Sequence, residues 1–174
     1  MVERNMYKWR ERTLPPLPPV PQSVQQLSDI LNSEEYNEWT RFNGGSFTVS
    51  PITDNNQFTS VIFIDVPFAR EIIANNDVLY CDATYKVKPT ITDAYQLLTF
   101  MIKFNHGFPI SYALMESKSQ SAYETVLTEV RRVLPQLNVT AVMTDFEIAL
   151  QNAIQEHFPE SEARRCFFHY IKKN

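Results

Sequence analysis

The chain has 174 residues, of which 44% are hydrophobic, 13% aromatic and 21% charged, and its formal net charge at pH 7 is −4. This length suits one ordinary domain with a full core and a short lead, and the composition excludes a disordered chain. The negative net charge excludes a strong overall positive field, so any contact with a phosphate backbone must come from local basic residues.

The cysteines and the first residues indicate a compartment. Cys81 and Cys166 have no Cys-x-x-Cys spacing, which excludes a disulfide scaffold and a four-ligand zinc site made by this chain alone. The start lacks the basic and then apolar run of a secretory signal, and no apolar stretch reaches the roughly 18 residues of a membrane-spanning helix. We therefore expect an intracellular protein that is not secreted and has no membrane partner.

Two segments precede the main domain. Residues 1–21 are expected to form a proline-rich linker in an extended conformation, with a ligand for an SH3 or WW domain as the less favoured interpretation. Residues 22–76 predict a small helix and hairpin segment. Its expected elements are helices over 24–31, 36–42 and 67–74 and strands over 46–50 and 59–65, the strands being joined by a turn at residues 54–56.

Residues 77–174 are expected to form the main domain. Strand-like runs over 78–85, 95–104 and 109–116, the last two joined by a short loop, predict an antiparallel meander. Two capping-box patterns, Ser121-x-x-Glu124 and Thr144-x-x-Glu147, then predict amphipathic helices. The remaining expected elements are a strand over 138–143, a strand over 163–167 and a helical start over 168–174.

The order of these elements predicts the fold class. Three meander strands followed by helix, strand, helix and strand is the order of the ribonuclease H-like fold, an α/β fold with a mixed sheet. The fourth strand lies beside the first in that topology, so Asp82 and Asp145 are expected to face each other on adjacent strands. Two neighbouring carboxylates favour a shared Mg²⁺ or Mn²⁺, which suits phosphodiester chemistry.

Three short runs resemble successive sequence blocks of MULE-type (Mutator-like) transposases. They are residues 80–86 (YCDATYK), 142–150 (VMTDFEIAL) and 166–169 (CFFH). Each run alone has low specificity, but three in this order and spacing are specific together. The resemblance covers residues 80–174 directly, and a weaker likeness extends toward the N-terminus.

The resemblance implies metal-dependent DNA transposition by an acidic triad. It assigns the first and second catalytic and metal-binding acids to Asp82 and Asp145, with Mg²⁺ or Mn²⁺ as cofactor, DNA at transposon ends as partner and the nucleus as location. It is compatible with a homo-oligomer. The domain is expected to be partial at its C-terminus, because the family's third acid lies well beyond the Cys-x-x-His block.

No residue of the chain is expected to replace that third acid. Glu147 fits a capping box, and Glu156 lies on the exposed side of the same predicted helix. We therefore expect a truncated and catalytically incomplete copy. The alternative is a non-catalytic, transposase-derived protein that binds DNA or protein. An unrelated ribonuclease H-type nuclease would need an acid on the first long helix, where Glu124 and Glu129 lie.

Other candidate residues carry less specific signals. Cys166 and His169 have ligand-compatible spacing, although packing at a strand-to-helix junction is the simpler interpretation. His106 in a loop and His157 near a helix end, where a cation is favoured, are not expected to act as bases. The basic residues near the predicted strand ends are low-specificity candidates for DNA contacts: Lys86, Lys88, Arg164, Arg165, Lys172 and Lys173.

Overall fold

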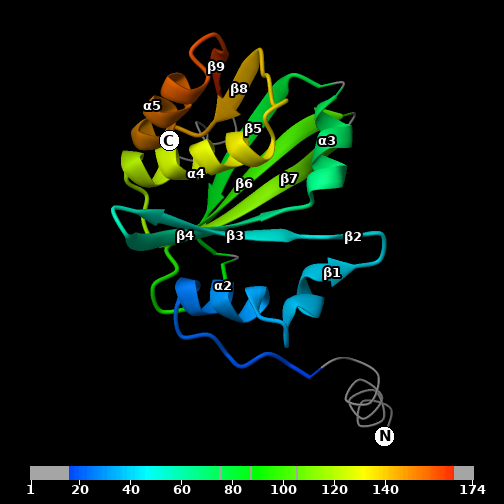
Figure 1. The fold of residues 1–174 in the computed structure, drawn as a ribbon. Coiled ribbons are helices and arrows are strands. Elements are labelled where there is room, and N and C mark those ends of the chain that lie inside the picture. The colour runs from blue at the N-terminus through cyan, green and yellow to red at the C-terminus, as the bar shows by residue number, and fades with distance from the viewer. Residues whose placement is uncertain (1–15, 75, 87, 105, 167–174) are drawn as a thin grey trace, which may run out of the picture.

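A computed structural model describes residues 16–74, 76–86, 88–104 and 106–166, and shows an α/β protein with a mixed sheet (Figure 1). The helices are α2 (Val24–Asn32), the 3₁₀ helix η1 (Asn37–Thr40), α3 (Val66–Ile73), α4 (Gln120–Val133) and α5 (Ile148–His157). The strands are β1 (Arg41–Phe42), β2 (Gly45–Ser46), β3 (Thr48–Asp54), β4 (Gln57–Ile64), β5 (Val78–Thr84), β6 (Gln96–Phe104), β7 (His106–Met115), β8 (Ala141–Thr144) and β9 (Glu162–Arg165).

Of the first two predicted helices, one forms as expected and the other is much shorter than expected. The predicted helix at residues 24–31 is confirmed as α2, whose N-terminus is capped because the Ser23 side chain accepts a hydrogen bond from the backbone N–H of Gln26. The helix predicted over residues 36–42 forms only as the four-residue 3₁₀ helix η1. Trp39 donates from its indole nitrogen to the Pro16 carbonyl at 3.0 Å, which holds the end of the proline-rich lead against this segment.

The β3–β4 hairpin forms as predicted. Asn55 and Asn56 occupy its turn with φ values of 49° and 64°, the left-handed conformations that asparagine tolerates and that match the twist of a two-residue hairpin. The hairpin also extends the main sheet, because β4 pairs antiparallel with β7.

The central strands confirm the predicted meander and its neighbour. The seven-stranded sheet has the order β3-β4-β7-β6-β5-β8-β9, in which β5, β6 and β7 are antiparallel neighbours. Strand β6 ends at Phe104 as expected, whereas β7 begins at His106 and so starts closer to the turn than the predicted residue 109. Strand β8 lies parallel beside β5, and β9 parallel beside β8.

The two helix starts differ from the prediction. Helix α4 is capped by Ser119, whose side chain accepts from Ala122 N–H, and not by Ser121, which instead donates to Asp54 at 2.7 Å. Helix α5 begins only at Ile148, and Glu147 at its N-cap makes no side-chain capping bond. The capping-box interpretation of Glu124 and Glu147 is therefore wrong.

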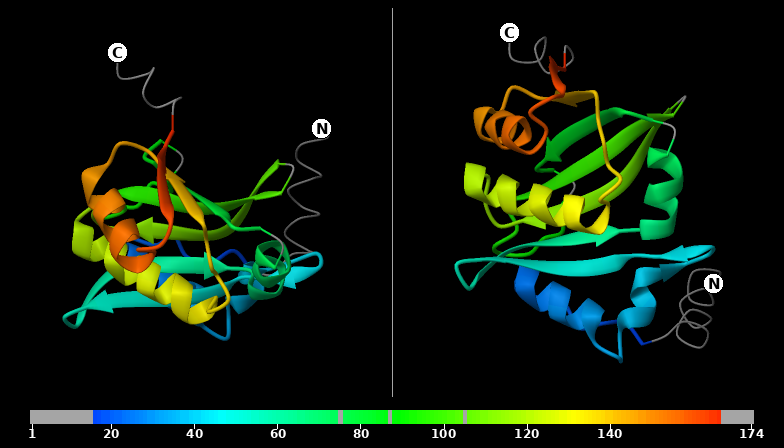
Figure 2. Two further views of the ribbon diagram at one scale, coloured as in Figure 1. Left: turned by 90° about the horizontal axis from the view of Figure 1, so that it is seen from above. Right: turned by 45° about the horizontal axis from the view of Figure 1, so that its top comes forward.

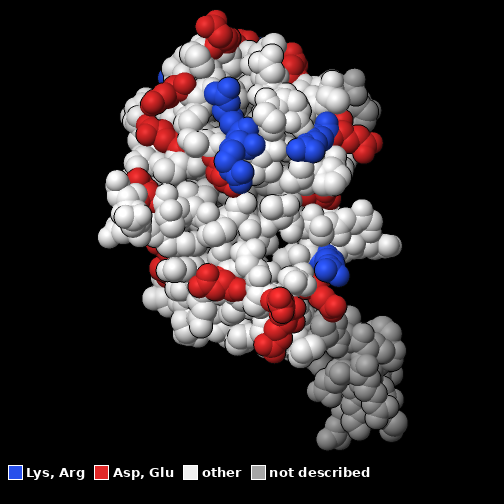
Figure 3. Space-filling model, viewed as in Figure 1, with Lys and Arg blue, Asp and Glu red and all other residues white. Residues whose placement is uncertain are grey.

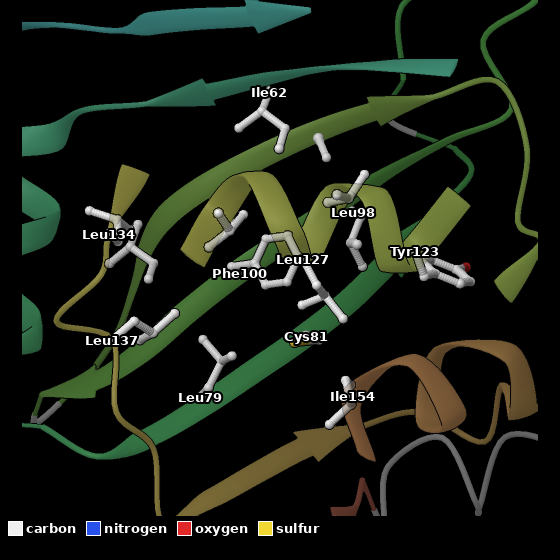
Figure 4. Close-up of a cluster of buried hydrophobic side chains, with 14 of the residues drawn as sticks. Ile62, Leu79, Cys81, Leu98, Phe100, Tyr123, Leu127, Leu134, Leu137 and Ile154 are labelled. Carbon is white, nitrogen blue, oxygen red and sulfur yellow. The ribbon is translucent and has the colours of Figure 1, made fainter. Parts of the chain in front are cut away.

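Helices cover both faces of the twisted sheet (Figure 2). The larger core lies between the strands and α3, α4 and α5, and Figure 4 shows Leu79 and Cys81 of β5 in it together with Leu127 and Ile154. The smaller core joins α2 to β3, β4 and β7 on the other face. None of the helices in the described ranges combines the length and the apolar character that a membrane span requires.

Candidate active site

Strand register aligns the two predicted acids. Cys81 of β5 lies opposite Thr144 of β8, and Thr144 lies opposite Arg165 of β9. The next residue on each strand is therefore Asp82, Asp145 or Cys166, and the Cys166 N–H donates to the Thr144 carbonyl at 2.9 Å. Asp82 lies within β5, and Asp145 and Cys166 directly follow β8 and β9, so the three residues occupy neighbouring positions toward the carboxyl ends of parallel strands.

Strand alternation places Asp82 on the face opposite to α4 and α5. Successive strand residues alternate between faces, and Cys81 belongs to the larger core, so Asp82 points the other way. A pocket of about 110 Å³ on this side is lined by both acids and their neighbours: Tyr80, Cys81, Asp82, Met101, Met143, Thr144, Asp145 and Cys166. The structure thus brings together Asp82, Asp145 and Cys166.

Local hydrogen bonds fix the loop after β8. One oxygen of the Asp145 carboxylate accepts the backbone N–H of Glu147 at 3.1 Å, and the Asp145 carbonyl accepts from the Gln151 side chain at 2.8 Å. Such an Asx-type turn leads the chain from the strand into α5. Asp145 therefore has a structural role at the helix start in addition to facing the pocket.

The pocket has a negative local field. Burial, followed by the charges of Asp145 and Asp82, raises the pKa of the Cys81 thiol well above its usual range. The thiol therefore stays protonated and is not a nucleophile. A divalent cation would relieve the repulsion between the two acids, because each carboxylate stabilises the same positive charge.

Glu147 follows Asp145 by two residues but interacts with two tyrosines, Tyr85 and Tyr123. The pKa of Tyr85 is raised to about 12, first by burial and then by neighbours that include Glu147 and Asp145. The pKa of the buried Tyr123 phenol is also raised, mainly by burial and to a smaller degree by Glu147. Glu147 thus faces two tyrosines. No three His, Cys, Asp or Glu side chains in the described ranges form a group able to hold a metal.

The predicted basic contacts are only partly available. Arg164 forms a salt bridge with Glu162 at 2.6 Å, and the Arg165 guanidinium lies 5.7 Å from the centre of the Phe146 ring. Lys86 is exposed and Lys88 half-buried just beyond β5. Figure 3 shows basic side chains as small groups on one face with acidic ones scattered around them, in keeping with the negative net charge.

The remaining candidates are three residues that the structure does not describe and His157. His169, Lys172 and Lys173 lie outside the described residues. His157 ends α5, but burial and then the charge of Arg131 lower its pKa, so the expected preference for a cation at this position is not met.

The order of blocks is matched by a family model. The MULE transposase domain matches residues 78–173, more than half of the chain. This chain belongs to the MULE transposase family. The matched region of this MULE domain begins at β5 and includes Asp82, Asp145 and the Cys166-x-x-His169 block. No curated protein matches the chain significantly.

Sequence reasoning missed an aromatic group at the same edge of the MULE domain. Tyr85 follows β5 directly, Tyr95 precedes β6, and their rings meet at 5.6 Å between centroids. Lys118 lies 5.8 Å from the centre of the Tyr95 ring. The available signal was the position of both tyrosines immediately beside strand ends, where a side chain is not required for the core.

Proposed function

We propose that this MULE-family chain holds a divalent cation on Asp82 and Asp145 and acts on DNA phosphodiester bonds. The observation that carries the proposal is the register of β5 and β8, which sets Asp82 beside Asp145, together with the one pocket that both acids line. The strand order, with a meander followed by parallel neighbours, supports assignment to the ribonuclease H-like class. A DNA substrate would place the protein in the nucleus.

The donor set suits Mg²⁺ or Mn²⁺. Both ions prefer oxygen ligands, and Mg²⁺ is commonly bound by one or two carboxylates together with waters and substrate phosphates. Asp82 and Asp145 provide such a pair, and the pocket beside them has room for further oxygen ligands. When bound, the ion would neutralise charge on a phosphate and activate the attacking oxygen.

The chain's own residues have distinct tasks in this proposal. Asp82, fixed within a paired strand, and Asp145, oriented by the Glu147 N–H, hold the two carboxylates toward the same volume. Lys86, exposed beyond the end of β5, is placed to contact a neighbouring phosphate. Because two acids supply only part of the ion's ligands, we expect weak ion binding that a DNA phosphate strengthens, and little or no cleavage by this chain alone.

The experiment is DNA binding with and without Mn²⁺. Anisotropy of a labelled duplex oligonucleotide is measured in Mn²⁺ and in EDTA for the wild type, Asp82→Asn, Asp145→Asn and the control Asp29→Asn, which alters an exposed acid of α2. Mn²⁺ should tighten binding about tenfold in the wild type and control, and have no such effect in the two site variants. An equal response to Mn²⁺ in all four proteins would contradict the proposed function.

A further inference from the structure

We infer that Tyr85 and Tyr95 form a stacking subsite for an unpaired base of the DNA strand held at the acidic pocket. This inference rests on the proposed function and adds that the DNA near the reacting phosphate is unpaired. Three observations carry the inference: the two tyrosine rings are exposed, a lysine lies beside them, and the rings are close to Asp82 along the chain.

The two rings are exposed although they touch. Tyr85 is 44% and Tyr95 41% exposed, and their planes meet at 88°. Perpendicular rings form a corner in which a planar base can stack on one ring while its edge meets the other. Neither ring belongs to the two hydrophobic cores, so core packing does not explain this pair.

The charge beside the rings suits a nucleotide. The Lys118 ammonium lies 5.8 Å from the Tyr95 ring centre, and Lys86 adjoins Tyr85 in the sequence. Single-stranded nucleic acid is commonly bound by aromatic side chains that stack on bases together with cations that contact the backbone. Glu147 is a nearby negative charge, which disfavours a phosphate at the rings themselves and leaves them to a neutral base.

The position of the rings fits a short piece of one strand. Tyr85 directly follows the last residue of β5 and comes three residues after Asp82, so the two residues are at most about 10 Å apart along the chain. Adjacent stacked nucleotides are about 3.4 Å apart, so the aromatic pair is a few nucleotides from a phosphate at the pocket. Tyr95 and Lys118 come from the adjoining ends of β6 and β7, at the same edge of the sheet as Asp145.

Stacking of a base on the aromatic pair would require a local opening of the duplex. A base in a duplex has both faces covered by its neighbours and offers none to an aromatic side chain. Stacking on Tyr85 or Tyr95 therefore requires an unpaired nucleotide. The expected preference is for single-stranded over duplex DNA, and it is independent of base identity because every base has a planar face.

The test compares single-stranded and duplex binding of the full chain in EDTA. The probe is a labelled 12-nucleotide oligothymidine, with a labelled duplex of equal length beside it. The variants are Tyr85→Leu, Tyr95→Leu and Tyr95→Phe. Phe42→Leu is the matched control, because Phe42 is 45% exposed and packs on another aromatic ring, that of Phe47, away from the two tyrosines in the sequence. Each Leu variant should weaken binding of the single strand about tenfold.

The other readouts separate this inference from its alternatives. Tyr95→Phe and Phe42→Leu should bind the single strand within twofold of the wild type, and duplex binding should change little in any variant. Unchanged binding in both Leu variants, equal weakening by Phe42→Leu, or no single-strand binding by the wild type would overturn the inference. The response of duplex binding to Mn²⁺ depends on Asp82 and Asp145, so its loss would remove the proposed function separately.

Discussion

Cys81 of β5 lies directly opposite Thr144 of β8 in the parallel register. Both residues are buried, so this pairing is fixed by the core and not by the acids that follow it. A slip of one residue would turn Asp145 to the other face of the sheet, because side chains alternate along a strand. The two carboxylates therefore face one pocket as a consequence of core packing several ångströms away.

The buried hydrogen bond between Gln96 and Tyr123 should contribute to stability. Gln96 donates from its amide nitrogen to the Tyr123 hydroxyl at 2.6 Å, and both side chains are fully buried. Tyr123→Phe removes this partner from an amide that cannot reach water. We expect the free energy of unfolding, measured with urea, to fall by about 1–3 kcal/mol.

A second substitution checks that cause. Gln96→Met in the Tyr123→Phe background removes the amide, which would otherwise keep only the weak Met115 sulfur acceptor at 3.4 Å, and keeps a similar volume, so most of the lost stability should return. If the double variant is as unstable as the sum of the single ones, the hydrogen bond is not the source of the effect.

The pair formed by Glu116 and Asp93 should make stability depend on pH. Burial, and then the neighbouring Asp93 carboxylate, raise the pKa of Glu116 to about 7 from the usual 4.5. Between these values the unfolded chain releases the Glu116 proton more readily than the folded chain, so the free energy of unfolding falls as pH rises. The stabilisation that the folded chain gains from protonated Glu116 is fully present below about pH 4.5 and is lost above about pH 7.

Glu116→Gln tests this sign. The variant should match the wild type near pH 4.5 and be more stable at pH 8, by about 1 kcal/mol or less because solvent screens a partly exposed group. Urea unfolding at the two pH values is the measurement, with the exposed Glu156→Gln as control. Greater stability of Glu116→Gln at pH 4.5 than at pH 8, each relative to the wild type, would refute the assignment.

Arg131 should hold the end of α5 against α4. Its guanidinium donates to the His157 carbonyl at 2.6 Å and lies 5.3 Å from the centre of the Phe158 ring. Arg131→Met keeps much of the side-chain volume but loses both contacts, so the free energy of unfolding should fall by about 1 kcal/mol. The pKa of His157, followed by NMR, should rise because the neighbouring positive charge has gone.

The adjacent residue provides the control. Arg132 pairs with Glu129 on the surface and its side chain is 68% exposed. Arg132→Met should leave both the stability and the His157 pKa unchanged. Equal effects of the two substitutions would show that general charge, and not the contact with α5, is responsible.

The sequence predicted the strands and their order well because each signal is local. Periods of two and of 3.6 residues marked the meander and the amphipathic helices, and the parallel neighbour of β5 followed from topology. The position of the two acids beside each other could be predicted for the same reason, since Asp82 lies within one recognisable strand and Asp145 directly follows another.

The helix starts could not be predicted because distant contacts decide them. Ser121 donates to Asp54 in the β3–β4 hairpin, which leaves Ser119 as the cap of α4. Thr144 is held as the last residue of β8 by pairing with Cys81, so it cannot begin a helix and α5 starts at Ile148. The contact between Tyr85 and Tyr95 likewise depends on strand pairing, because the sequence shows only that each tyrosine lies beside a strand end.

The central claim is that Asp82 and Asp145 share one cation. Calorimetric titration of Mn²⁺ into the wild type, Asp82→Asn, Asp145→Asn and the Asp29→Asn control, without DNA, tests it most directly. The account predicts one weak site in the wild type and control that disappears in each of the two site variants. Retention of that site in either Asp82→Asn or Asp145→Asn would contradict a shared metal centre.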